Sequence, residues 1–137
     1  MRMPWVRMGE QKLEYQGGLD SGVYIVVLYV PQDRAIRIGC LGRCNFRKGI
    51  YFYVGSAQRN LSARLERHSR KKKALRWHMD YLSAKAEVLV AITIAGPREL
   101  ECQLAKKLGK MFEPAVPGFG ASDCRCGGHL FYSTKLP

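Results

Sequence analysis

Residues 23–30 constrain the fold of this chain more than any other segment. They read VYIVVLYV and are followed directly by Pro31. β-Branched and aromatic side chains favour strands, the run is too short for a typical helix, and proline ends it. The segment is therefore predicted to be a buried strand.

Further strands are predicted where alternating or β-branched stretches follow turns. They cover residues 35–40, 50–54 and 88–94, and a last short strand is expected at 129–133. The first three strands are predicted to form an antiparallel meander.

Three helices are predicted from apolar residues spaced three and four positions apart. The first runs from a cap at Asn60 to about residue 73, and the second covers about residues 74–84. Pro97 suits the first position of the third, whose buried side is expected to carry Leu100, Leu104, Leu108 and Met111. The predicted fold is α+β, with a small antiparallel or mixed β-sheet flanked by helices.

The chain is predicted to form one domain. Its 137 residues, 47% of them hydrophobic, suffice to bury roughly two thirds of the unfolded surface around a single core. Residues 1–21 are polar and are expected to be either loose or an edge strand around Leu13-Glu14-Tyr15. Residues 22–137 form the predicted domain.

Composition limits the cellular setting. No stretch approaches the ~18 apolar residues that span a bilayer, and residues 1–10 lack the apolar segment of a secretory signal. Five cysteines are an odd number, which favours reduced thiols or metal ligands over a disulfide framework. A cytoplasmic protein with no membrane partner is expected.

Positive charge is concentrated in one part of the chain. The net charge is +12, and residues 59–76 hold eight cations against one anion, Glu66. Such a block attracts a polyanion, because each neutralised phosphate releases condensed counterions. The alternative is a solvated helix face. Nucleic acid, most of all DNA, is the expected partner, and the predicted contacts besides Arg64 are Arg59, Arg67, Arg70, Lys71, Lys72, Lys73 and Arg76.

A second pattern points to chemistry. Gly22-Val23-Tyr24 opens the first apolar run, Tyr53-Val54-Gly55 follows on a later one, and Arg64, His68 and Glu101 come after them. In order and residue type this pattern resembles the GIY-YIG nuclease superfamily. The resemblance covers nearly the whole predicted domain. It implies two paired strands that carry the tyrosines, an arginine on the next helix, and a carboxylate on a later helix that binds one divalent metal ion.

The resemblance also implies a role for each residue in the cleavage of a phosphodiester bond. The catalytic set is Tyr24, Tyr53, Arg64 and His68, in which a tyrosine accepts a proton and the arginine holds the phosphate. Glu101 is the implied ligand of Mg²⁺ or Mn²⁺, which helps to neutralise the charge that builds on the phosphate.

Each of these residues also has a simpler explanation. The tyrosines can be ordinary strand aromatics, Arg64 a snorkelling side chain at the core edge, and Glu101 a complement to a helix dipole. A tyrosine with an ordinary pKa near ~10 must have that pKa lowered before it acts as a base at neutral pH. Arg64 and a metal ion are expected to lower it.

Two features depart from the superfamily pattern. The tyrosine motifs are usually about ten residues apart, whereas 28 residues separate Tyr24 from Tyr53 here, which predicts an inserted strand and loop. Many relatives have lysine where this chain has Ser56, so a phosphate contact is either missing or supplied by Arg59. Both features resemble an uncharacterised branch of the superfamily that is sometimes fused to a base-excision DNA glycosylase, which implies a DNA-repair protein as partner.

The C-terminal part carries another cluster of candidate ligands, namely Asp123, Cys124, Cys126 and His129. Cys40 and Cys44 could join it from the inserted loop. Because Cys-x-Cys spacing is tight for zinc, buried thiols are expected rather than a structural zinc. His129 is instead a candidate additional residue of the metal and phosphate site.

Trp77 and His78 are expected to anchor the core, with the alternative that an exposed tryptophan stacks on an unpaired base.

The sequence therefore predicts a metal-dependent endonuclease that hydrolyses phosphodiester bonds in DNA, acting on structured or damaged DNA. An enzyme is favoured because binding alone would not require the lone carboxylate of Glu101. The alternative is a noncatalytic nucleic-acid-binding module that retains the fold, which Ser56 and the long insertion favour. A zinc-stabilised interaction domain is a more remote third reading.

Overall fold

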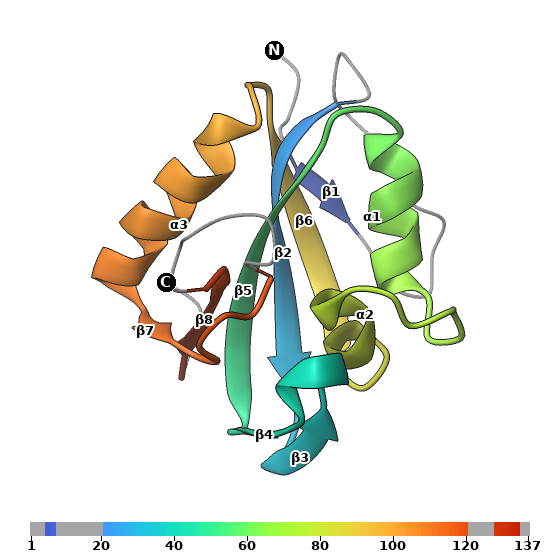
Figure 1. Cartoon of the computed structure of the whole chain (residues 1–137), viewed down its shortest axis with the longest axis vertical. Helices are drawn as coiled ribbons and strands as arrows, with labels where there is room; N and C mark the ends of the chain where they lie inside the picture. The colour runs from blue at the N-terminus through green and yellow to red at the C-terminus, as the bar shows by residue number, and fades with distance from the viewer. Residues whose placement is uncertain (1–4, 8–20, 121–127, 135–137) are drawn as a thin grey trace.

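The computed structural model describes residues 5–7, 21–120 and 128–134, which form an α+β fold around one main sheet (Figure 1). The sheet has six strands in the order β1-β6-β2-β5-β8-β7, and all of their pairings are antiparallel. Its strands are β1 Trp5–Arg7, β2 Gly22–Val30, β5 Gly49–Ala57, β6 Glu87–Ile94, β7 Glu113–Pro114 and β8 Leu130–Ser133. The predicted fold class is confirmed.

Helices cover both faces of the main sheet. α1 (Leu61–Ser69) and α2 (His78–Ser83) lie on one face, and α3 (Glu99–Met111) lies on the other (Figure 1). Leu61, Leu65, Met79 and Leu82 bury the first interface, whereas Leu100, Leu104, Ala105 and Leu108 pack on the second. None of the helices in the described part of the chain is long and apolar enough to cross a membrane.

The long pairing of β2 with β5 fixes which side chains share a face. It runs over nine residues of each strand, with Tyr24 opposite Gly55 and Val26 opposite Tyr53. Side chains alternate between faces along a strand. Tyr24 and Tyr53 therefore both point to the α1 side and join the same core cluster, while Ser56 points to the α3 side.

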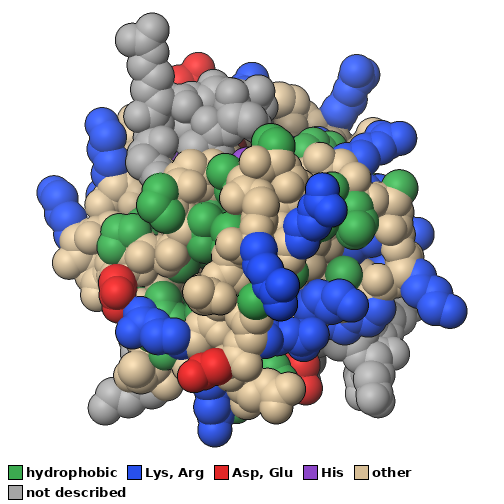
Figure 2. Space-filling view, turned by 60° about the horizontal axis from the view of Figure 1, so that its bottom comes forward, with side chains coloured by type: hydrophobic (Ala, Val, Ile, Leu, Met, Phe, Trp, Pro, Cys, Tyr) green, Lys and Arg blue, Asp and Glu red, His purple; other side chains and the backbone are tan. Residues whose placement is uncertain are grey.

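The predicted insertion is present, but the predicted meander is wrong. β3 (Arg34–Arg37) pairs with β4 (Arg43–Phe46) as a separate two-stranded sheet, with the short 3₁₀ helix η1 (Gly39–Leu41) at its turn. β3 cannot enter the main sheet beside β2, because β5 and β6 already occupy both edges of β2. Exposed cations of this hairpin and of the turn after it are Arg37, Arg43, Arg47 and Lys48. Figure 2 brings this end of the molecule forward and shows Lys and Arg side chains spread over it.

Several predicted helix details need correction. α1 ends at Ser69 rather than near residue 73, because the Lys73 ammonium reaches back to the carbonyls of Arg67 and His68 at the end of the helix. Asn60 occupies the N-cap position with φ 57°, but its side chain makes no capping hydrogen bond. Met111 was expected on the buried side of α3 but is 67% exposed. It is the last residue of the helix, and the next residue, Phe112, packs on Phe52 of the sheet in its place.

Two further boundaries differ from prediction. α2 begins only at His78, and α3 begins at Glu99, two residues after Pro97. The N-terminal segment does supply an edge strand, at Trp5–Arg7 beside β6. The residues for which that strand was predicted, Leu13-Glu14-Tyr15, lie outside the described residues.

Candidate active site

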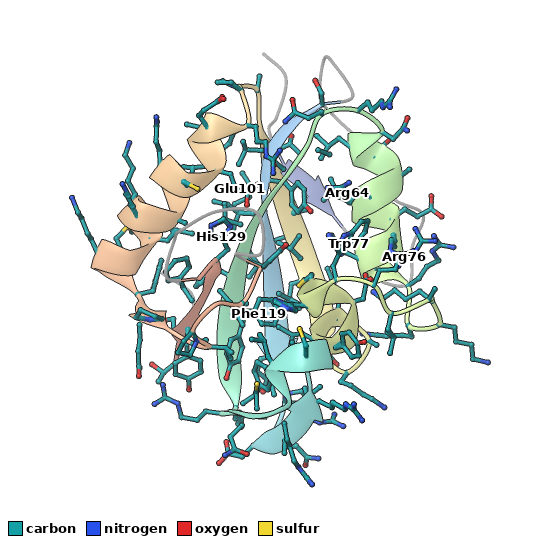
Figure 3. All side chains as sticks on the ribbon, in the orientation of Figure 1. Arg64, Arg76, Trp77, Glu101, Phe119 and His129 are labelled. Carbon is teal, nitrogen blue, oxygen red and sulfur yellow. The ribbon has the colours of Figure 1, made fainter. Side chains whose placement is uncertain are left out.

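A pocket of about 560 Å³ opens at the end of the main sheet where β2 begins and β5 ends. It is lined by side chains from both faces of the sheet, because the first turn of α3 lies on one side and α1 on the other. Glu101 and His129 lie on the α3 side of β5, and Arg64 and Trp77 on the α1 side (Figure 3). The lining residues are Tyr24, Gly55, Ser56, Gln58, Arg59, Arg64, Trp77, Arg98, Glu99, Glu101, Cys102 and Gly120.

The Tyr24 ring reaches the pocket because its cross-strand partner is a glycine. A Cβ atom on Gly55 would lie 2.6 Å from the Cζ and hydroxyl oxygen of Tyr24, closer than real Cβ atoms come. Any other residue at position 55 would displace the ring. The absence of a side chain at Gly55, in the motif Tyr53-Val54-Gly55, thus leaves space for the ring of Tyr24, in the other motif.

Tyr24 and His68 form a buried polar pair. The Tyr24 hydroxyl and His68 Nε2 are hydrogen-bonded at 3.0 Å, and both side chains are almost completely buried. His68 Nδ1 has no hydrogen-bond partner among the described residues. Tyr24 is therefore the group that fixes the position of the imidazole in this part of the structure.

Burial sets the protonation of this pair. It lowers the pKa of His68 to about 3, with the Lys73 charge acting in the same direction, so the imidazole is neutral at physiological pH. Burial also raises the pKa of Tyr24 above its ordinary value, and the opposing effect of the nearby Arg64 charge is smaller. The expected lowering of the Tyr24 pKa is therefore wrong for the protein by itself, although Arg64 acts in the expected direction.

Tyr53 lies behind the pocket rather than in its lining. Its ring centroid is 6.3 Å from that of Tyr24 and 6.0 Å from that of His68. A Cβ atom on Gly120, which has φ +71°, would come within 2.8 Å of the Tyr53 ring. Burial raises the pKa of Tyr53 well above its ordinary value. The structure thus brings Tyr53 next to the Tyr24–His68 pair as a packed aromatic.

Arg64 spans the mouth of the pocket on the α1 side. Its Nη1 donates to the backbone carbonyl of Ser56 at 2.6 Å, and its guanidinium lies 4.8 Å from the centre of the Trp77 ring. The backbone bond and the stacking contact hold the planar group in place. A guanidinium has five N–H donors, so others can bind a phosphate.

Glu101 lies on the α3 side of the pocket, and both of its carboxylate oxygens contact other side chains. Ser56 Oγ donates to Oε1 at 2.5 Å, and His129 Nδ1 lies 2.6 Å from Oε2. Burial would raise the pKa of Glu101, but the contacts with His129 and Ser56 outweigh it, so the pKa is lowered and the group is a carboxylate at neutral pH. The structure thus places His129 beside Glu101, and its role as an additional residue of the metal and phosphate site stays a prediction.

Ser56 connects the two sides of the pocket. Its carbonyl accepts from Arg64 on the α1 side, and its hydroxyl donates to Glu101 on the α3 side. The sequence marked this position only as a departure from the lysine of many relatives. Its role depends on a contact between distant elements, which no sequence spacing reveals.

The donor set around Glu101 fits a magnesium-type ion better than zinc. Mg²⁺ keeps most of its water and is bound by one or two carboxylates together with substrate phosphates. Glu101, one of the two carboxylates that line this open pocket, matches that mode. Among the described residues no group of three or more His, Cys, Asp or Glu side chains could hold a metal ion. Among the described residues, Cys40, Cys44 and Cys102 are in no disulfide, and Asp123, Cys124 and Cys126 lie outside the described residues.

Some of the predicted nucleic-acid contacts hold the fold together. Arg67 forms an ion pair with the buried carboxylate of Asp80, with Nη2 at 2.9 Å and Nε at 3.3 Å. The Lys71 ammonium donates to the carbonyls of Ser83 and Ala86, and Lys73 binds the end of α1. These three cations satisfy carbonyls and a buried carboxylate at the junction of α1 and α2, and their proposed contact with nucleic acid stays a prediction.

The other predicted cations are exposed. Arg59 lines the pocket, and Arg70, Lys72 and Arg76 project from the segment between α1 and α2. Arg98 also lines the pocket, at the start of α3, and was not singled out from the sequence. Three arginines, Arg59, Arg64 and Arg98, therefore line the same pocket as Glu101 and bring positive charge to it.

Trp77 and His78 do not share one environment. The expectation of a core anchor is wrong for Trp77, which is 41% exposed and lines the pocket, because the backbone after α1 brings it over the side chains of that helix. His78 is half-buried instead, accepts a hydrogen bond at Nδ1 from the backbone N–H of Gly120, and packs on Phe119.

A family model described as domain of unknown function DUF123 matches residues 23–137. The chain belongs to this family. The match includes every lining residue of the pocket in this DUF123 domain. Neither a curated protein nor a solved structure shows a significant match to the chain.

Proposed function

We propose that this DUF123 domain is a metal-dependent endonuclease of the GIY-YIG type that hydrolyses phosphodiester bonds in DNA. The observation that carries the proposal is the meeting of Arg64, Glu101 and the Tyr24–His68 pair at one open pocket, although they come from three different elements. A folded core does not require a guanidinium, a carboxylate and a hydroxyl–imidazole pair around a single opening.

The phosphate would bind at the arginine side of the pocket. Arg64 is held by Ser56 and Trp77, so its remaining donors are pre-positioned for phosphate oxygens. Arg59 and Arg98 add positive charge to the pocket. Cations fixed in a partly buried site stabilise the transition state most, because they need no reorganisation as negative charge builds on the phosphate.

A proton relay avoids a free phenolate at Tyr24, whose pKa is raised by burial. It requires that the negative charge of the bound phosphate raise the pKa of His68, which is about 3 in the protein by itself. The oxygen of an attacking water forms a bond to phosphorus while the bond from phosphorus to the leaving oxygen breaks. The Tyr24 oxygen accepts the proton of that water as its own proton passes to neutral His68 Nε2, 3.0 Å away. A free phenolate need not form, and the leaving oxygen takes a proton from the solvent in the pocket. The relay returns to its resting state when His68 and Tyr24 release a proton after the products leave.

Glu101 is the proposed protein ligand of Mg²⁺ or Mn²⁺. When bound there, the ion would supply positive charge beside the phosphate and the leaving oxygen. Ser56 and His129 hold the two carboxylate oxygens, and such neighbours orient a ligand and tune its basicity. His129 is thus proposed to position Glu101 rather than to take part in proton transfer.

A noncatalytic nucleic-acid-binding module is the second candidate. The observation in its favour is that both oxygens of Glu101 already have partners within the protein, so the carboxylate could be a structural link between α3, β5 and His129. The two candidates agree on a polyanionic ligand and differ on whether Glu101 is needed for turnover.

The experiment that separates them is a cleavage assay. Wild type and Glu101→Gln are incubated with nicked, branched, flapped and linear DNA, with and without Mg²⁺ or Mn²⁺. We expect wild type to cut at least one structured substrate only when metal is present, and Glu101→Gln to bind DNA but not cut it. Glu99→Gln, which changes a neighbouring carboxylate of the same pocket, is the matched control and should keep activity. A wild type that binds every substrate and cuts none supports the binding module instead.

A further inference from the structure

Trp77 is exposed but firmly positioned. Its side chain is 41% accessible, whereas buried aromatic rings fill the core beneath it. Its backbone N–H donates to Asp80 Oδ2 at 2.9 Å, and Asp80 is itself buried and paired with Arg67. The N-terminal end of α2 is thereby fixed, and the indole with it.

Two guanidinium groups hold the indole against α1. Arg64 lies 4.8 Å and Arg67 5.0 Å from the centre of the ring, and these arginines are one helical turn apart. Cation–π contacts of this kind orient an aromatic side chain. The ring is therefore anchored through its contacts with α1 while much of its surface remains accessible.

The exposed ring lies in the same pocket as the residues proposed to act on the phosphate. Trp77 lines the opening together with Tyr24, Arg64 and Glu101. Figure 3 shows Trp77 and Arg64 on the α1 side of β5 and Glu101 on the α3 side. The volume of about 560 Å³ is within the range of roughly 300–1,000 Å³ for small-ligand sites. There is room beside Arg64 for more than a phosphate group.

An accessible aromatic ring next to a phosphate-binding arginine is the usual arrangement for stacking a nucleobase. Any unpaired base can stack on such a ring, because every base has a π-face, and arginine adds a cation–π contribution. Bases inside a duplex are already stacked on their neighbours and must be extruded first, which costs a few kcal/mol. A stacking platform in the pocket therefore selects nucleotides that are already unpaired.

We propose that Trp77 is the stacking platform for an unpaired base next to the phosphate held by Arg64, so that the substrates of this site are nucleic acids with at least one unpaired nucleotide. The inference deepens the proposed function and rests on it for the position of the phosphate. It assigns Trp77 as a specificity-determining residue. The simple alternative is that Trp77 only shields the side chains of Arg64 and Arg67 on α1.

Binding is measured in EDTA so that cleavage does not interfere. Labelled DNA with a single-stranded flap is compared with a fully paired duplex and with an abasic flap of equal length, by fluorescence anisotropy. We expect the flap to bind more tightly than both the duplex and the abasic flap. Trp77→Ala should lose roughly 5- to 100-fold in affinity for the flap and little for the duplex, and Trp77→Phe should retain most of the affinity.

Leu75→Ala is the matched control, since Leu75 is 48% exposed in the same segment. It should bind the flap like wild type. Equal affinity for the flap and the abasic flap would overturn the proposal, and so would a Trp77→Ala variant that binds the flap as wild type does.

Tryptophan fluorescence gives a second, independent readout. The chain has two tryptophans, so Trp5→Phe leaves Trp77 as the only indole. Its emission should be quenched when single-stranded oligonucleotide is added and unchanged by the abasic strand. If Trp5→Phe does not fold, the difference between wild type and Trp77→Phe reports the same signal. Absence of quenching at saturating oligonucleotide contradicts stacking.

These outcomes separate the inference from the nuclease proposal. A protein that binds flaps through Trp77 but cuts no DNA in Mg²⁺ or Mn²⁺ refutes the nuclease and keeps the stacking site. A protein that cuts paired and flapped DNA equally fast, with Trp77→Ala unchanged, keeps the nuclease and refutes the stacking platform.

Discussion

Arg64 and Arg67 lie one turn apart on α1 and both contact Trp77, yet they belong to two different regions of the molecule. Arg64 faces the pocket, where its Nη1 donates to the backbone carbonyl of Ser56. Arg67 faces the α1–α2 junction, defined by Arg67, Lys71, Lys73 and Asp80, where it neutralises a buried carboxylate. In the sequence the two arginines belong to one basic block. Their hydrogen-bond partners, rather than their charge, are the reason we propose a chemical role for Arg64 and a structural role for Arg67.

The comparison predicts opposite consequences of substitution in the two regions. Changes in the pocket should remove activity with little loss of stability, and changes in the α1–α2 junction should do the reverse. The expected effects follow, from the largest to the smallest.

Asp80→Ala should have the largest effect on stability. The Asp80 carboxylate is fully buried and accepts hydrogen bonds from Arg67 and from the backbone N–H groups of Arg76 and Trp77. Its removal leaves these donors unpaired, and we expect a loss of about 3–5 kcal/mol in the free energy of unfolding. Chemical denaturation measures it. Glu66→Ala, at an exposed position on α1, is the control and should change stability by less than about 0.5 kcal/mol. Equal stability of both variants would show that the junction does not hold the fold.

Tyr24→Phe should have the largest effect on turnover relative to its effect on the fold. The ring still packs over Gly55, but the hydroxyl that contacts His68 is lost. A positioned proton-transfer group contributes about 10²–10⁴-fold to rate, so kcat should fall at least a hundredfold while Tm changes little. Steady-state cleavage of a flapped DNA measures kcat. A Tyr24→Phe variant with normal kcat would assign the hydroxyl to packing alone, and Tyr51→Phe, distant from the pocket, should be active.

His68 should make stability depend on pH. Its folded pKa is lowered to about 3, whereas the unfolded chain has an ordinary histidine pKa near ~6.5. Between these values the unfolded state binds more protons, so stability rises with pH over this window and is lost as pH falls below about 6.5, with a slope approaching about 1.4 kcal/mol per pH unit. Urea denaturation at pH 4.5, 5.5 and 6.5 tests this slope. His68→Gln should flatten it, and an unchanged slope in that variant would place the titration on another group.

Lys72 and Lys73 sharpen the comparison within the basic block itself. Lys72 is exposed, whereas the Lys73 ammonium binds carbonyls at the end of α1. Lys72→Glu should weaken binding to all DNA similarly and lower the salt slope by about 1, without a change in Tm. Lys73→Glu should lower Tm. Measurements of Kd between 50 mM and 200 mM salt, together with Tm, distinguish the two variants. If both variants changed Kd and Tm in the same way, Lys72 and Lys73 would not have separate roles in DNA binding and in the fold.

The parts of the fold that could be predicted are those marked by local sequence patterns. The strand around Val23–Val30 and the strand at 88–94 are marked by β-branched runs, and the side of α3 that carries Leu100, Leu104 and Leu108 is marked by spacing. The meander was wrong because the pairing of β3 depends on which edges of β2 are free, which is a property of the whole sheet.

A residue of the candidate site could be predicted only where its proposed role follows from the chemistry of its own side chain. Arg64 and Glu101 could be named from the sequence, and both line the pocket. The roles of Ser56 and Trp77 could not be assigned. The Ser56 hydroxyl binds Glu101 only because α3 packs on one face of the sheet, and Trp77 is exposed beside Arg64 only because α1 packs on the other face. The predicted direction of the shift in the Tyr24 pKa was wrong for a related reason, since residue spacing does not reveal how deeply a side chain is buried.

The most direct test of the account compares Arg64→Gln with Arg67→Gln. Both variants remove one positive charge from the same helix, so overall electrostatics change equally. Each is assayed for Mg²⁺-dependent cleavage of flapped DNA, below its own Tm, and for thermal unfolding. We predict that Arg64→Gln lowers kcat/KM by at least about a hundredfold with Tm nearly unchanged, and that Arg67→Gln lowers Tm but cuts at close to the wild-type rate. An Arg64→Gln variant that cuts as fast as Arg67→Gln would contradict the assignment of the pocket as the active site.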